Sequence, residues 1–373
     1  MPNKDKILIC GILPPPFFGH SMMYKMLMES EFVRAHDVVF LNMSFWSYEK
    51  HRKITVDKIF KMTRYLVRYI RLLVRHRPRY VLFNMSFDKM PFLKDYLFCL
   101  IGRLFGARIV LHDMGQYLPE LYHGSGPVLR TLIRHLLGFT TAIIVMGQKV
   151  KAQYAPFFDL KRIQVVPGSV EDTVDISISK LPRADPKEIK VLYFSFLSRS
   201  KGIWTALKAI PKVVAENKDI FFQFGGPIES EALHEQMKAF IADNHLSANL
   251  EYIGYVGDVN KRTECYRNAD IFIFPTHRDV FGLVILHAMA ESVPVIASIE
   301  GTIPEIIADG TNGLLFPKAD ANALAEKILA LVADADLRRK MGGANRRRYL
   351  DVYAPDKYGK AMIRAFEEIH ARS

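Results

Sequence analysis

Two basic residues stand shortly before a glycine in a loop that follows a predicted strand. The apolar run Val191–Phe196 leads into this loop, which contains Arg199 and Lys201. Gly202 closes the loop, and a helical pattern begins at the next residue. Two cations beside the free N–H groups of a helix start could hold a diphosphate. A solvated turn would have the same composition, so these residues alone leave both interpretations open.

An acidic residue precedes a second helix start of this kind. Asp279 follows the apolar strand Ile271–Phe274. The next backbone amides, those of Phe281, Gly282 and Leu283, would point toward an anionic leaving group, because the first N–H groups of a helix have no partner within it. A helix-capping role for Asp279 competes with this interpretation.

A pair of glycines marks a third junction between a strand and a helix. Gly225 and Gly226 end the apolar run that begins at Phe221. Because glycine has no Cβ atom, a ligand could approach the backbone closely at this point. A plain tight turn is the alternative.

Short apolar runs alternate with helical patterns along the whole chain, and this alternation predicts strand–helix–strand units with parallel sheets. We therefore expect an α/β fold with two Rossmann-like, doubly wound parallel-sheet domains. The two domains would face a cleft, since such folds bind ligands at the carboxyl ends of their strands. The expected ranges are 1–172 for the first domain, 173–188 for a linker and 189–352 for the second domain. A final helix within 353–373 would pack back on the first domain.

The formal net charge of +12 implies an anionic partner. Six basic residues recur at spacings of three or four and would form one stripe along a helix: Lys58, Lys61, Arg64, Arg68, Arg71 and Arg75. Like charges at these spacings repel each other, so we weigh an anionic membrane surface against an ordinary solvated face. No recognition motif accompanies the stripe, and we therefore do not expect nucleic acid as a partner.

Composition also bears on compartment and cofactors. The apolar run Ile7–Leu13 is too short for an export signal, and the three cysteines lie far apart, which favours reduced thiols in a cytosol. We expect a cytoplasmic protein that the basic stripe could hold on the inner face of a membrane. No Asp-x-Asp pair lies near the proposed anion site, and we expect neither a metal nor a cofactor.

The segment from Arg278 to Phe316 resembles the glycosyltransferase group 1 family, which is retaining glycosyltransferase family 4 with the GT-B fold. The resemblance is carried by Arg-Asp-Val-Phe-Gly-Leu-Val-Ile-Leu-His-Ala-Met-Ala-Glu-Ser-Val-Pro-Val-Ile-Ala-Ser, by Gly301-Thr-Ile-Pro-Glu305 and by Asn312-Gly-Leu-Leu-Phe316. It is strong over Lys190–Leu331 and fainter in the first half. It implies that the first domain binds an acceptor and the second a nucleotide-sugar donor.

The resemblance also implies roles in the donor half. The two glutamates of the family fall on Asp279, which would face the donor sugar, and on His287, which would hold the ribose hydroxyls. The arginine expected in the family's Gly-Arg-Leu is missing, since the chain reads Ser195-Phe196-Leu197. Arg199 is our candidate substitute, and Lys201 stands in its expected place.

In the first half, the resemblance places Gly19 in a loop that covers the diphosphate, with His20 in place of a partner glycine. It places His112 at a strand end near the reacting sugar. Arg199, Lys201 and the amides from Phe281 onward would stabilise the leaving diphosphate, while Asp279 and His112 would orient the sugar and the acceptor.

The implied activity is retaining, metal-independent transfer of a sugar from a UDP- or GDP-sugar to an acceptor. The expected acceptor is a glycan or a lipid-linked saccharide in bacterial surface polysaccharide synthesis. The substitutions at the site keep open a catalytically silent nucleotide-sugar-binding protein or partner subunit. A sugar-nucleotide epimerase is a further alternative, and a periplasmic sugar-binding protein is disfavoured by the missing export signal.

Overall fold

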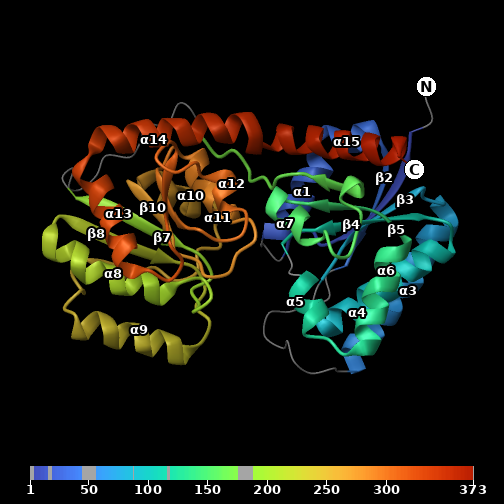
Figure 1. The fold of residues 1–373 in the computed structure, drawn as a ribbon, viewed down its shortest axis with the longest axis horizontal. Coiled ribbons are helices and arrows are strands. Elements are labelled where there is room, and N and C mark those ends of the chain that lie inside the picture. Colours follow the sequence, from blue (N-terminus) through green and yellow to red (C-terminus); the bar gives the residue numbers. More distant parts are fainter. Residues whose placement is uncertain are drawn as a thin grey trace. The chain divides into compact units, whose positions relative to one another are not determined.

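A computed structural model describes residues 4–15, 19–43, 56–86, 88–115, 118–174 and 188–372, without the side chains of 56–59 (Figure 1). The chain divides into two compact units. The first comprises Met1–Gly168 together with Pro355–Ser373, and the second comprises Ser169–Ala354. Most of the expected linker, residues 175–187, lies outside the described residues.

The first unit contains a six-stranded sheet in which every paired strand is parallel. Its strand order is β2 (Asp37–Asn42), β1 (Lys6–Gly11), β3 (Tyr80–Asn84), β4 (Arg108–Asp113), β5 (Thr140–Val145) and β6 (Ile163–Val165). β-Branched and aromatic residues fill the central strands, and most of these residues are fully buried. Its helices are α1 (Gly19–Glu29), α2 (Glu31–Ala35), α3 (Val56–His76), α4 (Lys89–Leu104), α5 (Leu118–His123), α6 (Pro127–Phe139), α7 (Gln148–Gln153) and α15 (Pro355–Ala371).

The second unit contains another six-stranded parallel sheet. Its order is β12 (Gly313–Phe316), β11 (Val295–Ser298), β10 (Ile271–Phe274), β7 (Ile189–Phe194), β8 (Ile220–Gly225) and β9 (Leu250–Tyr252). This is the strand order of the Rossmann fold. The chain starts at β7 in the middle of the sheet, adds strands toward one edge, and then returns to the middle and adds strands toward the other edge. Its helices are α8 (Ile203–Glu216), α9 (Glu231–Asp243), α10 (Val259–Asn268), α11 (Leu283–Ala290), α12 (Ile303–Ile306), α13 (Ala321–Ala333) and α14 (Ala335–Arg348).

The last helix, α15, belongs to the first unit although the second unit precedes it in the chain (Figure 1). Its Phe366 ring packs edge-on against Phe32 of α2 and Tyr80 of β3. Gly359 lies so close to Ser30 that an added Cβ would come within 2.8 Å of the serine Cβ. The helix therefore completes the core of the first unit.

The boundary between the units differs from our expectation. Residues 169–172, which we assigned to the first domain, lie in the second unit. Ser169 donates a hydrogen bond to the carbonyl of Tyr353 at 2.7 Å, and Tyr349 donates to the carbonyl of Val170 at 2.8 Å. Asp172 forms an ion pair with Arg346 at 2.8 Å. These bonds attach the segment to the end of α14 and the turn that follows it.

The expected α/β fold with two doubly wound parallel sheets is confirmed. The sequence pattern predicts helices within 21–29, 57–75, 92–105, 128–137, 149–154, 203–216, 231–243, 283–290, 321–332 and 355–371. It does not predict α2, α5, α10, α12 and α14. They are short, or they lack a regular apolar face, as in α10, whose only buried residue is Tyr266. Within the described part of the chain, no helix is both long enough and apolar enough to span a bilayer.

Candidate functional site

The candidate site lies where the order of the second sheet reverses. β7 and β10 are neighbours there, so the loops that follow their carboxyl ends meet. The carbonyl of Ser200, in the loop after β7, accepts hydrogen bonds from the amides of His277 and Arg278 at 2.9 and 3.0 Å. These two bonds fix the loop that carries Lys201 against the loop that carries Asp279.

Gly202 is required by the close approach of these loops. Its φ of 79° lies in the left-handed region, and an added Cβ would lie 1.8 Å from the carbonyl oxygen of Pro275. The glycine after Lys201 therefore lets the start of α8 pack against the end of β10. This packing determines where the lysine side chain begins.

Lys201 and Asp279 form an ion pair. The lysine Nζ lies 2.5 Å from Oδ2 of Asp279 and also donates to the carbonyl of Arg278 at 3.0 Å. The lysine side chain is 25% exposed and the aspartate side chain 17% exposed. The structure thus brings together two residues that the sequence assigned to one site.

The other oxygen of Asp279 holds the turn that leads into α11. Oδ1 accepts hydrogen bonds from the amides of Phe281 at 3.1 Å and Gly282 at 2.8 Å. Two of the three amides that we expected to face an anionic leaving group are therefore held by this carboxylate, because its short side chain reaches back to its own loop. Among the described residues, the amide of Leu283 has no acceptor.

A third loop, which we did not assign to the site, supports the Asp279 loop. The amide and the hydroxyl of Thr302 both donate to the carbonyl of Val280, at 2.9 and 2.5 Å. Gly301 packs so tightly that an added Cβ would lie 2.1 Å from the carbonyl oxygen of Asp279. The glycine in the Gly301-Thr-Ile-Pro-Glu305 motif was the available signal for this role.

The structure holds Arg199 in a different set of contacts from those of Lys201. Its guanidinium donates to Oε1 of Gln236 on α9 at 2.9 Å and lies over the Trp204 ring, 5.9 Å from the centroid. Our expectation that Arg199 replaces the missing arginine beside Lys201 has no support in these contacts. Its side chain instead joins α9 to the start of α8.

Gly225 and Gly226 serve the packing of the backbone. An added Cβ would lie 2.6 Å from the Phe194 ring at Gly225 and 1.8 Å from the carbonyl oxygen of Ser195 at Gly226, where φ is 123°. The tight-turn interpretation therefore accounts for both glycines.

His287 lies on α11, and its ring stacks on Tyr266 with centroids 5.5 Å apart. Burial, with a smaller contribution from the positive charge of Arg262, lowers the pKa of His287 to about 3. The ring is therefore neutral at physiological pH and can both donate and accept a hydrogen bond. Among the described residues, no hydrogen-bond partner contacts either ring nitrogen.

His112, in the first unit, is fully buried at the carboxyl end of β4. Its Nδ1 lies 3.3 Å from the hydroxyl of Tyr24, whereas Nε2 is buried without a hydrogen-bond partner among the described residues. Burial, with a smaller contribution from His20, lowers the pKa of His112 to about 3. A buried ring nitrogen without a partner is costly, and a bound ligand is one way in which it could gain a partner.

The loop that carries Gly19 is described only in part, because residues 16–18 are outside the described ranges. Gly19 is exposed and begins α1, and His20 follows it. The Nε2 atom of His20 lies 3.2 Å from the carbonyl oxygen of Met114, just beyond β4. These contacts place the start of α1 beside the strand end that carries His112.

Among the described residues, one group of three side chains could bind a metal ion. Glu231, His234 and Glu235 on α9 bring their ligand atoms within 4.8 Å of one another. Both glutamates are exposed. Independence from a metal ion therefore stays a prediction.

Replacing Asp279 with Ala should lower the free energy of unfolding by about 1 kcal/mol, because the amides of Phe281 and Gly282, in the turn before α11, lose their acceptor. Replacing it with Asn should cost less, since the amide oxygen can still accept from Phe281 and Gly282. Urea unfolding of both variants measures this difference. Equal stability of the Ala variant and the unchanged chain would contradict the role of Asp279 in holding this turn.

Lowering the pH should destabilise the first unit through His112. The folded-state pKa of about 3 lies below the unfolded value, so the stabilisation is complete above roughly pH 6.5 and declines as the unfolded chain takes up a proton. The expected slope well below pH 6.5 is about 1.4 kcal/mol per pH unit. Urea unfolding between pH 7 and pH 5 tests this, with the exposed His123→Gln as control. His112→Gln should flatten the slope, and an unchanged slope would refute the assignment.

Residues 176–348 match the family model described as glycosyl transferases group 1. The capsular polysaccharide biosynthesis glycosyltransferase CapM of Staphylococcus aureus is 32% identical over 158 residues, which is 42% of this chain and 40% of CapM. The chain spans about half the length of the curated relatives it matches.

Solved structures share the fold along the whole chain. A glycosyltransferase from Rickettsia africae superposes with a TM-score of 0.75 at 17% identity and covers 100% of both chains. HepE of Anabaena gives a TM-score of 0.73 at 15% identity over 97% of this chain and 99% of its own. At these identities the likeness shows the fold alone, which is the GT-B type. Residues 176–348 are therefore similar in sequence to glycosyl transferases group 1, and the whole chain shares its fold with solved glycosyltransferases.

Proposed function

We propose that the protein is a retaining glycosyltransferase that moves a sugar from a nucleoside-diphosphate sugar to an acceptor. The observation that carries the proposal is the contact between Lys201, Asp279 and the start of α11 at the reversal point of the second sheet. This group lies inside the segment that matches the family model. It combines a cation, a carboxylate and a helix N-terminus in one place.

Negative charge grows on the diphosphate as its bond to the sugar breaks. Lys201 can exchange its bond with Asp279 for a phosphate oxygen, because its Nζ is partly exposed and already positioned by the Arg278 carbonyl. The amide of Leu283 and the positive end of the α11 dipole add to this attraction. Preorganised donors of this kind stabilise a transition state more than flexible ones do.

The carboxylate of Asp279 would have two consequences during transfer. It holds Lys201 before the donor binds, and it keeps a negative charge near the anomeric carbon, where positive charge develops. The hydrogen bonds from the amides of Phe281 and Gly282 keep it from turning away. His287, neutral and stacked on Tyr266, would bind the ribose hydroxyls.

The first unit would supply the acceptor side. We propose that the unpartnered Nε2 of His112 contacts the reacting sugar and that the Gly19 loop covers the diphosphate. Retention of configuration and independence from a metal ion are part of this proposal. They follow from the family resemblance and from the cationic character of the group around Lys201.

The comparisons support the class of donor and acceptor. HepE of Anabaena was solved with UDP-glucose, and CapM is named for capsular polysaccharide biosynthesis. We infer that the donor substrate is a UDP- or GDP-sugar and that no further cofactor is needed. The acceptor would be a glycan or lipid-linked saccharide of a bacterial cell surface.

We further propose that the first unit binds the cytoplasmic, anionic face of a membrane through α3. Five members of the predicted stripe are exposed, and the side chain of the sixth, Lys58, is outside the described set; the five are Lys61, Arg64, Arg68, Arg71 and Arg75. Beside them on the helix lie Phe60, Val67 and Val74, which are 70%, 42% and 57% exposed. An apolar line next to a basic line is typical of helices that lie in a membrane interface.

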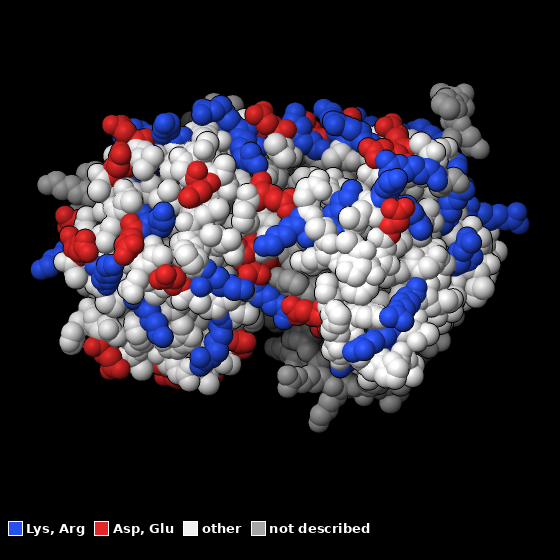
Figure 2. Space-filling model, viewed as in Figure 1, with Lys and Arg blue, Asp and Glu red and all other residues white. Residues whose placement is uncertain are grey.

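The helices next to α3 also have few acidic residues. α3 packs against α4, and α4 packs against α6. These three helices contain two acids, Asp57 and Asp95, and Asp95 is buried. Over α4 and α6, Figure 2 shows basic side chains among uncharged ones with few acidic neighbours. Such a surface is complementary to anionic lipid.

Lys201→Ala should lower turnover by about 10² to 10³, the range expected when one preorganised donor is removed. A thermal-shift screen of UDP- and GDP-sugars first identifies the donor, and product formation is then measured. Lys208→Ala, an exposed lysine on the same α8 helix, is the matched control. Near-normal turnover by Lys201→Ala would refute the role. Donor binding without any turnover by the unchanged chain would instead indicate a binding protein.

Replacing Arg64, Arg68 and Arg71 with Gln should reduce binding to anionic vesicles by about two orders of magnitude, since each basic residue near such a surface contributes about 1 kcal/mol. Co-sedimentation with phosphatidylglycerol and phosphatidylcholine vesicles measures the effect. The control replaces three exposed arginines elsewhere: Arg34, Arg339 and Arg364. Equal partitioning of the unchanged chain into anionic and neutral vesicles would exclude the membrane role.

A further inference from the structure

A cavity of about 340 Å³ opens at the amino-terminal edge of the first sheet. Arg108 and Thr140, which begin β4 and β5, contribute to its wall, together with residues of α4, α6, β6 and α15. His112 ends β4 at the opposite edge of the same sheet. The cavity is therefore separate from the site proposed for transfer.

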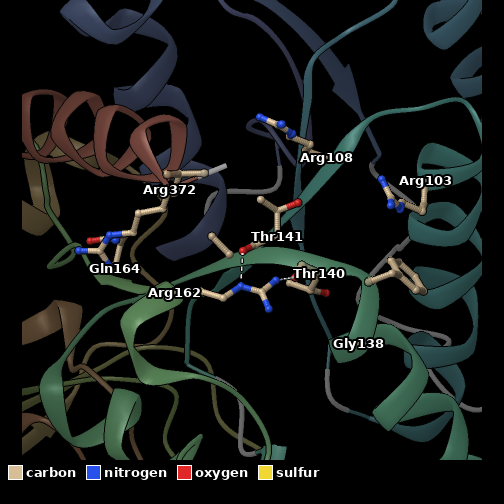
Figure 3. Close-up of a pocket in the computed structure, with 11 residues that line it drawn as sticks. Arg103, Arg108, Gly138, Thr140, Thr141, Arg162, Gln164 and Arg372 are labelled. Carbon is tan, nitrogen blue, oxygen red and sulfur yellow. Dashed lines mark hydrogen bonds between the residues drawn. The ribbon is translucent and has the colours of Figure 1, made fainter.

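Four arginines line the cavity, and no acidic residue does so. Figure 3 shows Arg103 and Arg108 on one side, Arg372 beside Gln164 on the other, and Arg162 between them. Four like charges around one small volume repel each other, and an anion bound among them would reduce this repulsion. Clustered charges of one sign also raise the local concentration of ions of the opposite sign.

Arg162 is held in place by bonds to the backbone. It donates to the carbonyls of Thr140 and Thr141, the latter at 2.9 Å (Figure 3). Its guanidinium also lies 4.6 Å from the centroid of the Phe158 ring. These bonds use two of its five N–H donors, and the fixed plane directs the others. The arginine is thus a rigid part of the cavity wall.

Arg372 and Arg103 are the adaptable members of the set. Arg372 reaches the cavity from the end of α15, donates to the carbonyl of Lys161 and lies 3.6 Å from Glu368. Arg103 is exposed in the last turn of α4, and no partner for its side chain occurs among the described residues. Both can turn toward a ligand without breaking the core.

We propose that this cavity binds a phosphate group. The planar forks of arginine match phosphate oxygens in pairs, and Gln164 adds an amide donor. The volume exceeds that of one phosphate and fits a diphosphate or a small phosphorylated molecule. Two sources share this chemistry. One is a soluble phosphate compound, and the other is an anionic lipid headgroup, because the exposed Leu104 directly follows Arg103.

The test measures binding of inorganic pyrophosphate by isothermal titration at low ionic strength. Arg103→Gln combined with Arg372→Gln should weaken binding by about tenfold or more, because charge-assisted hydrogen bonds are lost. The matched control is Arg34→Gln with Arg364→Gln, which removes two exposed arginines of the same unit from outside the cavity. Lys201→Ala serves as a second control, since it removes the cation of the proposed donor site.

Retained binding in both controls and loss in the Arg103/Arg372 variant would establish the cavity as a phosphate site, whether or not the chain transfers sugars. Unchanged affinity in the Arg103/Arg372 variant would overturn the proposal. An equal loss in the Arg34/Arg364 control would also overturn it, because the effect would then reflect net charge alone.

Vesicle flotation shows whether the phosphate group belongs to a lipid headgroup or to a soluble compound. Pyrophosphate that releases the unchanged chain, but not the Arg103/Arg372 variant, from phosphatidylglycerol vesicles would assign the cavity to a lipid headgroup. Vesicle binding that pyrophosphate leaves unaltered, together with the titration result, would assign it to a soluble phosphate compound.

Discussion

The second unit depends on one carboxylate that serves two structural partners. One oxygen of Asp279 accepts from the amides of Phe281 and Gly282 in the turn that leads into α11, and the other holds the ammonium of Lys201. Because the two bonds share a single short side chain, the cation and the helix end cannot move independently. Ser200, Gly202 and Thr302 bring the three surrounding loops close enough for this arrangement. Acidic, basic and backbone groups thereby form a single preorganised unit.

The sequence predicted most of the fold because the pattern is regular. Apolar strand runs and helical patterns recur along both halves, and α8 begins at Ile203, directly after Gly202, as expected. Helices without a regular apolar face, such as α10 and α14, could not be found by periodicity, since their positions depend on packing rather than on pattern.

The sequence predicted which residues lie in the candidate site, but it did not predict the hydrogen bonds that they make. Lys201 and Asp279 were both assigned from the loops that carry them, yet spacing cannot show that a carboxylate will take up the amides of its own loop. Arg199 lies two residues from Lys201, and only the fold shows that its side chain turns toward Gln236. Likewise, the glycines at 225 and 226 meet neighbouring backbone and ring atoms that are distant in sequence.

The return of α15 to the first unit has a consequence for synthesis on the ribosome. Phe32 and Tyr80 emerge early, but the ring that covers them belongs to Phe366, near the end of the chain. During translation that part of the core of the first unit stays uncovered until the whole second unit has been synthesised. A chaperone that shields the α2–β3 surface would have its longest period of contact with the nascent chain there, and a premature stop before α15 would leave an apolar surface open to aggregation.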